Sequence, residues 1–272
     1  YALITNVDYD HVDFFKSEAD YRQAYEDYSK NVKEALFLFG DDPLVKSLNM
    51  HTKAYTYGLN PDNDIVGTIL SETKNTTLLS INYCGQEMGE IECPFSGRHL
   101  VWNAIGCIAI ALTEGVPLNI IQEGIRHFEN AARRFVVEEI GDNVYIDDYA
   151  HHPTEVSVTI DAARLKYPNH KLVAIFKPHR VSRLYHFVDD FAKALKKADE
   201  VYLVGFNAID DQEEGYDITI DYLKERIENA LVIEENEKGA MILKNHEPAV
   251  YLFMSSKDIY ILSDLLKRYQ NS

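Results

Sequence analysis

The chain has 272 residues and a formal net charge of −17 at pH 7, which would repel the phosphate backbone of a nucleic acid. Nucleic acid is therefore excluded as an expected partner. Apolar residues make up 46% of the chain, which argues against disorder, and the length allows two domains that each bury a core. The longest apolar run, 104–112, is shorter than the roughly 20 residues that span a bilayer, so no membrane insertion is expected.

The three cysteines, Cys84, Cys93 and Cys107, lack the paired spacing of a zinc site or a redox motif. They are predicted to be free thiols in a reducing compartment, which favours a cytoplasmic protein. Residues 1–6 contain neither an initiator Met nor the basic start of a signal peptide, and they are predicted to open a strand. We therefore expect the chain to be part of a longer protein.

The first part of the chain alternates strands and helices, which predicts a parallel sheet. Strands are expected at 2–7, 35–39 and 54–57, a helix at 17–33 with Ser17 as its N-cap, and a short helix after the turn 40–43. Three strand-like segments then follow without a helix, at 65–70, 76–83 and 87–93. They predict a small antiparallel sheet attached to the parallel core. Two helices close this part, one at 97–114 and one that ends near 127.

The organisation restarts at 128–134, so the chain is predicted to divide into domains at 1–130 and 131–272. Strands are expected at 144–148, 171–176, 200–204, 230–233 and 249–254. Helices are expected at 153–166, 219–229 and 257–269, with a short one after 233 and one whose apolar stripe is Leu184, Val188, Phe191 and Leu195. This alternation predicts a doubly wound α/β domain with ligands at the carboxyl ends of its strands. The segment 210–214 is expected to be a solvated acidic loop.

The turn after the strand 144–148 is the first candidate site. Asp147, Asp148, His151 and His152 lie between this strand and the next helix, which begins at Pro153. An open α/β sheet binds ligands at such turns, beside a helix N-terminus that favours anions. Any one of these side chains could simply cap the helix, but four ionisable groups together are more typical of a site.

A second strand-to-helix turn carries Arg180 and Arg183. Two guanidiniums three residues apart can share one helix face and bind a carboxylate or a phosphate. The helix dipole disfavours cations at an N-terminus, so this placement favours anion binding over simple solvation at the surface.

Three weaker candidates leave alternatives open. Arg133-Arg134, at the predicted domain junction, could contact a phosphate or form an interdomain salt bridge. His11, in a loop with several aspartates, could ligate a cation, although a lone histidine in a loop is more often structural. His99 and Asn103 share a helix face, where Asn103 could bond a base edge or the backbone. The chain contains no phosphate-loop or dinucleotide-binding motif.

In their order and spacing, five segments resemble the Mur ligase family. They are Ile4-Thr-Asn-Val-Asp-Tyr-Asp-His11, His99-Leu-Val-Trp-Asn103, Arg133-Arg-Phe135, Ile146-Asp-Asp-Tyr-Ala-His-His-Pro-Thr-Glu155 and Pro178-His-Arg-Val-Ser-Arg183. The segment 147–155 is most similar to the branch that joins L-alanine to UDP-N-acetylmuramate. The resemblance covers essentially the whole chain. It implies the latter part of a central parallel-sheet ATPase domain with a small antiparallel subsheet, followed by a doubly wound, Rossmann-like C-terminal domain.

This resemblance implies an ATP-dependent ligase of peptidoglycan biosynthesis. Such enzymes use ATP and Mg²⁺ to phosphorylate the muramoyl carboxylate, and the amine of L-alanine then attacks the acyl phosphate. The implied substrates are UDP-N-acetylmuramate and L-alanine, while nothing in the sequence indicates the oligomeric state. The UDP-binding domain, the phosphate loop and a metal-binding glutamate of the family would lie upstream of Tyr1, so the chain alone is expected to be inactive.

By resemblance, the expected site residues fall into three groups. The metal-binding residue is His11. The cofactor-binding residues are His99, Asn103, Arg134, Asp148 and Tyr149. The catalytic and substrate-binding residues are His151, His152, His179, Arg180 and Arg183, of which the two arginines would hold the carboxylate of the incoming amino acid.

The chain departs from the family pattern at three places. Leu100 replaces an adenine-contacting Asn, Lys177 replaces a Gln, and Ser255-Ser-Lys257 replaces a Gly-Ala-Gly turn. Two alternatives therefore stay open. One is a murein tripeptide ligase, which attaches a preformed peptide to the same sugar acid, and the other is a divergent, non-catalytic paralogue.

Overall fold

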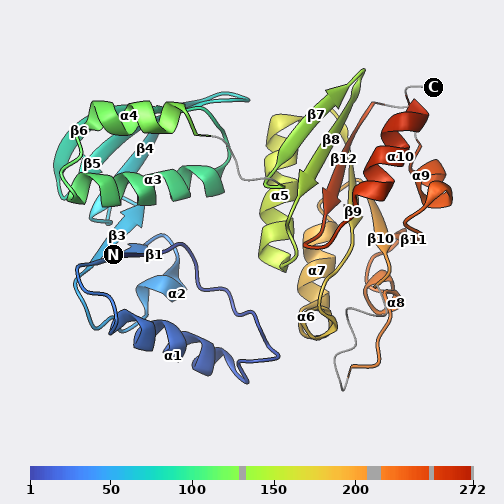
Figure 1. Ribbon diagram of the computed structural model, residues 1–272, viewed down its shortest axis with the longest axis horizontal. Coiled ribbons are helices and arrows are strands. Elements are labelled where there is room, and N and C mark those ends of the chain that lie inside the picture. The colour runs from blue at the N-terminus through green and yellow to red at the C-terminus, as the bar shows by residue number, and fades with distance from the viewer. Residues whose placement is uncertain (129–132, 207–215, 245–247, 271–272) are drawn as a thin grey trace. The chain divides into compact units, whose positions relative to one another are not determined.

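The computed structural model describes residues 1–128, 133–206, 216–244 and 248–270. The chain forms two compact units, one of Tyr1–Asp10 and Phe14–Glu129 and the other of His11–Asp13 and Asn130–Ser272 (Figure 1). The domain boundary predicted after residue 130 and the acidic loop predicted at 210–214 both lie outside the described residues.

The first unit is built on a six-stranded sheet with the order β1-β2-β3-β4-β5-β6. Its strands are β1 Ala2–Ile4, β2 Leu36–Phe39, β3 Ala54–Gly58, β4 Ile65–Glu72, β5 Thr77–Tyr83 and β6 Gln86–Cys93. Strands β1 to β4 pair in parallel, whereas β5 is antiparallel to both β4 and β6. The predicted antiparallel sheet is thus confirmed, and it is continuous with the parallel core.

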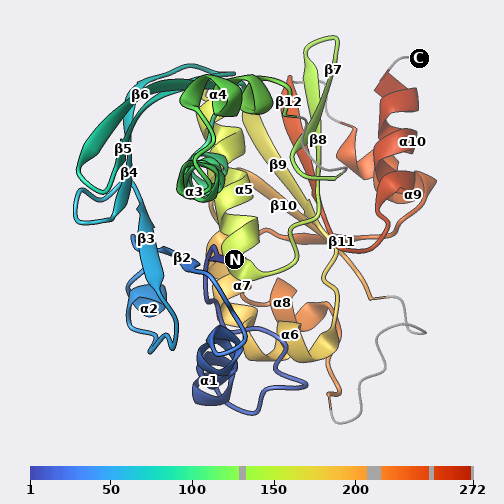
Figure 2. The same ribbon diagram turned by 60° about the vertical axis from the view of Figure 1, so that its left-hand side comes forward.

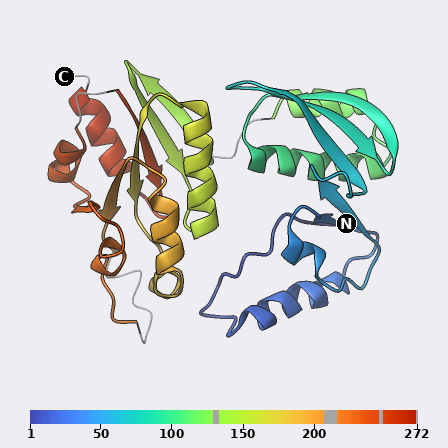
Figure 3. The same ribbon diagram turned by 180° about the vertical axis from the view of Figure 1, so that it is seen from behind.

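The described helices of the first unit are α1 Glu18–Ser29, α2 Pro43–Lys46, α3 Arg98–Thr113 and α4 Leu118–Arg126. Ser17 caps α1 as predicted, because its hydroxyl accepts the Asp20 amide at 3.1 Å. Helix α3 turns Val101, Ile105 and Ile108 into the core, and all three are fully buried. Figure 3 shows α3 and α4 beside strands β4 to β6.

The second unit is a doubly wound α/β domain, as predicted. Its sheet has the order β11-β10-β9-β12-β8-β7 and is parallel except where β7 meets β8. Its strands are β7 Val136–Ile140, β8 Asn143–Asp148, β9 Lys171–Phe176, β10 Glu200–Val204, β11 Leu231–Ile233 and β12 Ala249–Met254. Its described helices are α5 Pro153–Lys166, α6 Val181–His186, α7 Val188–Leu195, α8 Asp221–Lys224, α9 Glu237–Leu243 and α10 Tyr260–Gln270. Figure 2 shows α9 and α10 on one face of the sheet and α5 and α7 on the other.

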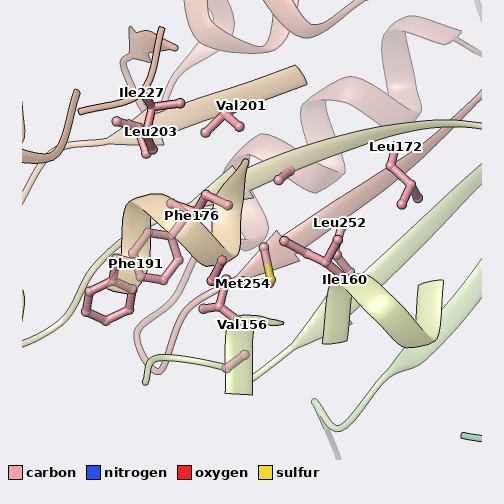
Figure 4. Packing of buried hydrophobic residues seen from close by; sticks show 14 of the residues in the cluster. Val156, Ile160, Leu172, Phe176, Phe191, Val201, Leu203, Ile227, Leu252 and Met254 are labelled. Atoms are coloured by element: carbon pink, nitrogen blue, oxygen red, sulfur yellow. The ribbon is translucent and has the colours of Figure 1, made fainter. Parts of the chain in front are cut away.

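Each face of this sheet carries its own apolar core. Ile146 and Leu252 pack with α5 and α7, in the cluster that Figure 4 shows. Their neighbours Tyr145 and Tyr251 pack with α9 and α10 instead. Alternate residues of β8 and β12 therefore point to opposite faces, which is why β12 is apolar throughout and β8 is apolar from Val144 to Ile146.

Three elements differ from the prediction. Strand β7, at the edge of the sheet, was not predicted because Glu138 and Glu139 interrupt its apolar residues. It pairs with β8 through a turn in which Gly141 has a φ of 58°. The helix expected across the Leu184 stripe is two helices, α6 and α7, that meet at Phe187, although all four stripe residues are buried. The helix expected at 219–229 shortens to α8.

The structure also bears on the expected state of the cysteines and on the expected lack of a membrane-spanning helix. Cys84, Cys93 and Cys107 are free thiols, as predicted. Among the described helices, none combines the length and the apolar character that crossing a bilayer requires.

Leu252→Ala is expected to lower the free energy of unfolding by about 2–5 kcal/mol, because it leaves a cavity in the core of the second unit. Leu252 is 1% exposed, whereas Leu165 on α5 is 56% exposed and provides the matched control. Leu165→Ala should change the same quantity by less than about 0.5 kcal/mol. Urea unfolding followed by circular dichroism measures both, and equal losses would contradict the assigned core.

Candidate functional site

Three turns meet at the carboxyl edge of the second sheet. Strand β12 lies between β8 and β9, and all three are parallel, so the turns that follow them are neighbours. Backbone hydrogen bonds join these turns, from Ser255 N to Asp148 O at 3.2 Å and from Lys177 N to Met254 O at 3.1 Å. The two polar turns singled out from the sequence therefore share one edge, with the turn after β12 between them.

Asp148 organises the turn after β8. Its side chain is buried, with 6% exposed, and its two oxygens accept hydrogen bonds from three segments of the chain. Oδ2 accepts the Phe135 amide at 2.8 Å, while Oδ1 accepts the Ala150 amide at 2.8 Å and the Thr159 hydroxyl at 3.2 Å. Burial raises the pKa of Asp148, although these hydrogen bonds act against that rise. The carboxylate thus links the segment before β7, the turn and α5.

Asp147 points to the opposite face, as the alternation of a strand requires. Its Oδ2 accepts a hydrogen bond from Arg133 Nε at 3.3 Å. Burial raises the pKa of this carboxyl group too, and the neighbouring guanidinium acts to lower it. Asp147 and Asp148 therefore lie on opposite faces of the sheet and have different hydrogen-bond partners.

Arg133 fastens the start of the second unit to the turn after β12. Its Nη2 donates to Ser255 O at 2.7 Å and to Lys257 O at 3.0 Å. The guanidinium also lies over two rings, 5.0 Å from the centroid of Tyr260 and 5.5 Å from that of Tyr149. These contacts lie within one unit, so they favour a local structural role for Arg133 over the interdomain salt bridge considered from the sequence.

Arg134 is placed differently from its neighbour. Its side chain is 50% exposed, its guanidinium lies 5.1 Å from the centroid of Tyr149, and its Nη1 is 3.7 Å from Glu155 Oε1. Long ion pairs at such exposure hold a side chain only weakly. Arg134 therefore keeps a solvent-facing charge beside Tyr149 that an anionic ligand can approach.

His151 has a defined tautomer. Its Nδ1 lies 2.9 Å from Tyr149 O and 3.1 Å from Glu155 Oε2. A carbonyl oxygen can only accept, so Nδ1 carries the hydrogen, and in the neutral ring Nε2 is the basic nitrogen. In the described part of the chain Nε2 has no hydrogen-bond partner. The half-buried ring thus presents a nitrogen that can accept a proton.

Glu155 holds this arrangement from the first turn of α5. Its Oε2 accepts the backbone amides of His151 at 2.9 Å and His152 at 3.2 Å, in the manner of a capping box. Burial acts to raise the pKa of Glu155, but the hydrogen bonds and charge of His151, together with Arg134, lower it to about 2. The carboxylate stays ionised at neutral pH. The ring of His152 packs edge-on against Phe187, 5.4 Å between centroids, which connects this turn to the end of α6.

The turn after β9 places His179, Arg180 and Arg183. Arg180 has a φ of 67°, an unusual conformation for a residue with a side chain. Arg183 is only 3% exposed and its Nη1 donates to His179 O at 3.3 Å. Surface solvation, the alternative considered for this pair, is therefore wrong for Arg183. A buried guanidinium can hold an anion more strongly than an exposed one, because its surroundings screen charge less.

The other predicted residues belong to the first part of the chain. His11 is exposed in the loop after β1, with a φ of 53°. His99 is half-buried in the first turn of α3, and Asn103 is exposed one turn later on the same face. No hydrogen bond from Asn103 to the backbone is found in the described part of the chain, which leaves its amide available. Within the same residues, no three His, Cys, Asp or Glu side chains form a metal-binding group.

Several residues of this site had no predicted role. Glu155, Thr159 and Ser256 act through contacts with Asp148, His151 or His179 that join distant segments. Glu155 lies three residues after His152, which is the spacing of a capping box. This spacing could have indicated that Glu155 caps α5, but histidine is not one of the usual N-cap residues. The other two leave no local pattern, since their partners are set by strand order.

Comparison with known families gives two matches in tandem. The Mur ligase middle domain matches residues 1–111, and the Mur ligase glutamate ligase domain matches residues 133–256. Together they cover most of each unit.

Individual relatives agree with these matches. The UDP-N-acetylmuramate--L-alanine ligase of Leuconostoc mesenteroides is 38% identical over 95% of this chain and 58% of its own length. The enzyme of the same name from Streptococcus suis is 38% identical over 100% of this chain and 62% of its own length. The chain thus spans about three fifths of the curated relatives it matches. The crystal structure of UDP-N-acetylmuramate-alanine ligase from Thermotoga maritima superposes with a TM-score of 0.74 at 28% identity, over 99% of this chain and 59% of that one. The ADP complex of MurF from the same organism superposes with a TM-score of 0.74 at 18% identity, over 99% of this chain and 62% of that one. This match shows the shared fold.

Glu155→Gln is expected to lower the free energy of unfolding by about 1 kcal/mol at neutral pH, because a neutral amide replaces the carboxylate that caps α5. The pKa of Glu155 falls from the ordinary 4.5 to about 2 in the folded protein, so its contribution is complete above pH 4.5 and is lost as the pH falls toward 2. Urea unfolding of both proteins across this window should show the difference shrinking. Asp161→Asn on the same helix, where Asp161 pairs with Lys197 at the surface, is the control. A difference that does not change with pH would contradict the assignment.

Proposed function

Because this chain belongs to the Mur ligase family, we propose that the protein carrying it joins L-alanine to the muramoyl carboxylate of UDP-N-acetylmuramate, with ATP and Mg²⁺, in peptidoglycan biosynthesis. The observation that carries the proposal is the buried Arg183 at the sheet edge where the chain also places His151. The similarity to ligases of this name over 95% of the chain supports the choice of substrates.

The proposed chemistry has two steps. The γ-phosphoryl group of ATP passes to a carboxylate oxygen of the muramoyl group, which gives an acyl phosphate and ADP. The amine of L-alanine then attacks the acyl carbon, the C–N bond forms, the C–O bond to phosphate breaks, and inorganic phosphate leaves. The amine must lose its protons along the way, and charge gathers on the transferred phosphoryl group and the acyl oxygen.

The turn after β9 would bind the amine substrate through its carboxylate. Arg183 is buried, so a carboxylate hydrogen-bonded to it would be held in a medium that screens charge poorly. Arg180 precedes it at the start of α6, and His179 lies beside both. Holding the carboxylate fixes where the α-amine of the same small molecule can reach.

The turn after β8 would handle the proton. A histidine with Nδ1 bound to a carbonyl and a carboxylate can accept a proton at Nε2, and the Glu155 carboxylate stabilises the resulting imidazolium. His151 is therefore the candidate base for the ammonium of L-alanine. His152, packed on Phe187, would line the same edge.

Each part of the chain also carries residues that would bind nucleotide or metal. His99 and Asn103 on α3 would contact the base, and Arg134 beside Tyr149 would reach the phosphates. Asp148 would act through the turn that it organises, since its oxygens already accept three hydrogen bonds. Mg²⁺ is commonly bound by one or two carboxylates together with water and phosphate oxygens, so His11 would add a nitrogen ligand to a set made mainly of oxygen. When bound, the ion would neutralise phosphate charge.

The catalytic unit is proposed to be larger than these 272 residues. The relatives extend beyond the matched region, and the sequence contains no phosphate-loop motif. We therefore infer that the chain by itself does not catalyse ligation, and activity tests belong to the whole protein that carries it.

The central test is ADP release by the whole protein with Mg²⁺, UDP-N-acetylmuramate and, in separate reactions, L-alanine, glycine, L-serine or the murein tripeptide. We expect L-alanine to support the highest kcat/KM. Preference for the tripeptide would transfer the protein to the murein tripeptide ligases. Absence of turnover with every amine would support a non-catalytic paralogue and overturn the proposal.

Arg183→Ala in the whole protein is expected to raise the KM for L-alanine by about 10- to 100-fold, because a carboxylate would lose a charge-assisted hydrogen bond. Arg183→Lys should recover part of the loss through its remaining charge. Arg164→Ala is the matched control, since Arg164 lies in the last turn of α5, away from this edge, and pairs with Asp199 before β10. An unchanged KM for L-alanine in a folded Arg183→Ala protein would remove the assignment.

A further inference from the structure

The turn after β9 is fastened by a buried lysine. The Lys177 side chain is 5% exposed, and its Nζ donates to Glu235 Oε2 at 2.6 Å and to Asp258 O at 3.0 Å. Its backbone amide donates to Met254 O. Lys177 thus joins the ends of β9 and β12 to the loop between β11 and α9.

The same two turns are joined again at His179. Ser256 Oγ lies 2.8 Å from His179 Nδ1, and the carbonyl oxygen of His179 accepts a hydrogen bond from Arg183 Nη1 at 3.3 Å. His179 is therefore held at its ring from the turn after β12 and at its backbone by the arginine proposed to bind substrate. A change in the turn after β12 can reach Arg183 through one residue.

These contacts are concentrated where the backbone is least relaxed. Arg180 directly follows His179 and has a φ of 67°, so the turn needs outside contacts to keep its conformation. A lysine is rarely buried unless it is paired, and Lys177 is paired with Glu235 next to this turn.

We propose that Lys177 and Ser256 are positioning residues, which hold His179, and through it Arg180 and Arg183, in the geometry that binds the carboxylate of the amine substrate. This inference rests on the proposed function. Neither residue needs to contact substrate. Their effect should appear in the binding of L-alanine and not in the binding of ATP.

Ser256→Ala tests the milder contact, because it removes one hydroxyl and leaves the chain otherwise unchanged. In the whole protein we expect the KM for L-alanine to rise about 3- to 10-fold, the range that one lost hydrogen bond produces, with the KM for ATP within about 2-fold of wild type. Ser256→Thr retains a hydroxyl and should restore the wild-type KM. An unchanged KM for L-alanine in Ser256→Ala, or equal changes for both substrates, would overturn the inference.

Lys177→Met combined with Glu235→Gln removes the buried pair without leaving an unpaired charge. We expect a larger rise in the KM for L-alanine than in Ser256→Ala, again without an equal change for ATP. Lys171→Met with Glu200→Gln is the matched control, since that pair also spans 2.6 Å and joins the other end of β9 to β10. Equal effects of the two double variants would reduce Lys177 to a general stabilising role and contradict the proposal. Failure of the wild-type protein to release ADP with L-alanine is a separate outcome, because it would overturn the proposed function itself.

Discussion

The second unit depends on a carboxylate, Asp148, that is almost completely buried at the end of β8. A buried charge is tolerated only when hydrogen-bond donors surround it. Here the donors are the amides of Phe135 and Ala150 and the hydroxyl of Thr159, which come from three separate segments. Satisfying one charge therefore fixes the entry of the chain into this unit, the turn that carries His151, and the seating of α5 on the sheet.

A second consequence of this layout is electrostatic. The protein carries a net charge of −17, yet one sheet edge gathers several cations, which are Arg133, Arg134, Lys177, Arg180 and Arg183. The chain's own oxygens hold several of these cations: backbone carbonyls accept from Arg133, Glu235 from Lys177, and Asp13 Oδ2 from Arg180 at 2.7 Å. Positive groups that are already ordered need not reorganise when an anion arrives, and this lowers the entropic cost of binding it.

Much of this architecture could be predicted from the sequence, because strands β8, β9 and β12 each contain an apolar run that polar residues follow. Residue spacing could not show that Arg183 is buried. Its burial depends on how α6 packs, and α6 is a separate helix because the chain breaks at Phe187 before α7. Residue spacing also could not pair Lys177 with Glu235, 58 residues apart, because strand order brings them together. Edge strand β7 could not be predicted either, because a largely exposed strand lacks a clear alternation of apolar and polar residues.

The positive φ of Arg180 has a consequence for how this protein can change. A left-handed conformation costs a residue with a side chain on the order of 1–2 kcal/mol, and glycine would avoid that cost. Glycine there would also delete a guanidinium from the edge that holds Arg183. Stability therefore favours glycine at position 180, whereas ligand recognition favours arginine. Laboratory selection for heat resistance alone should enrich glycine at this position, while selection for substrate use should retain the strained arginine.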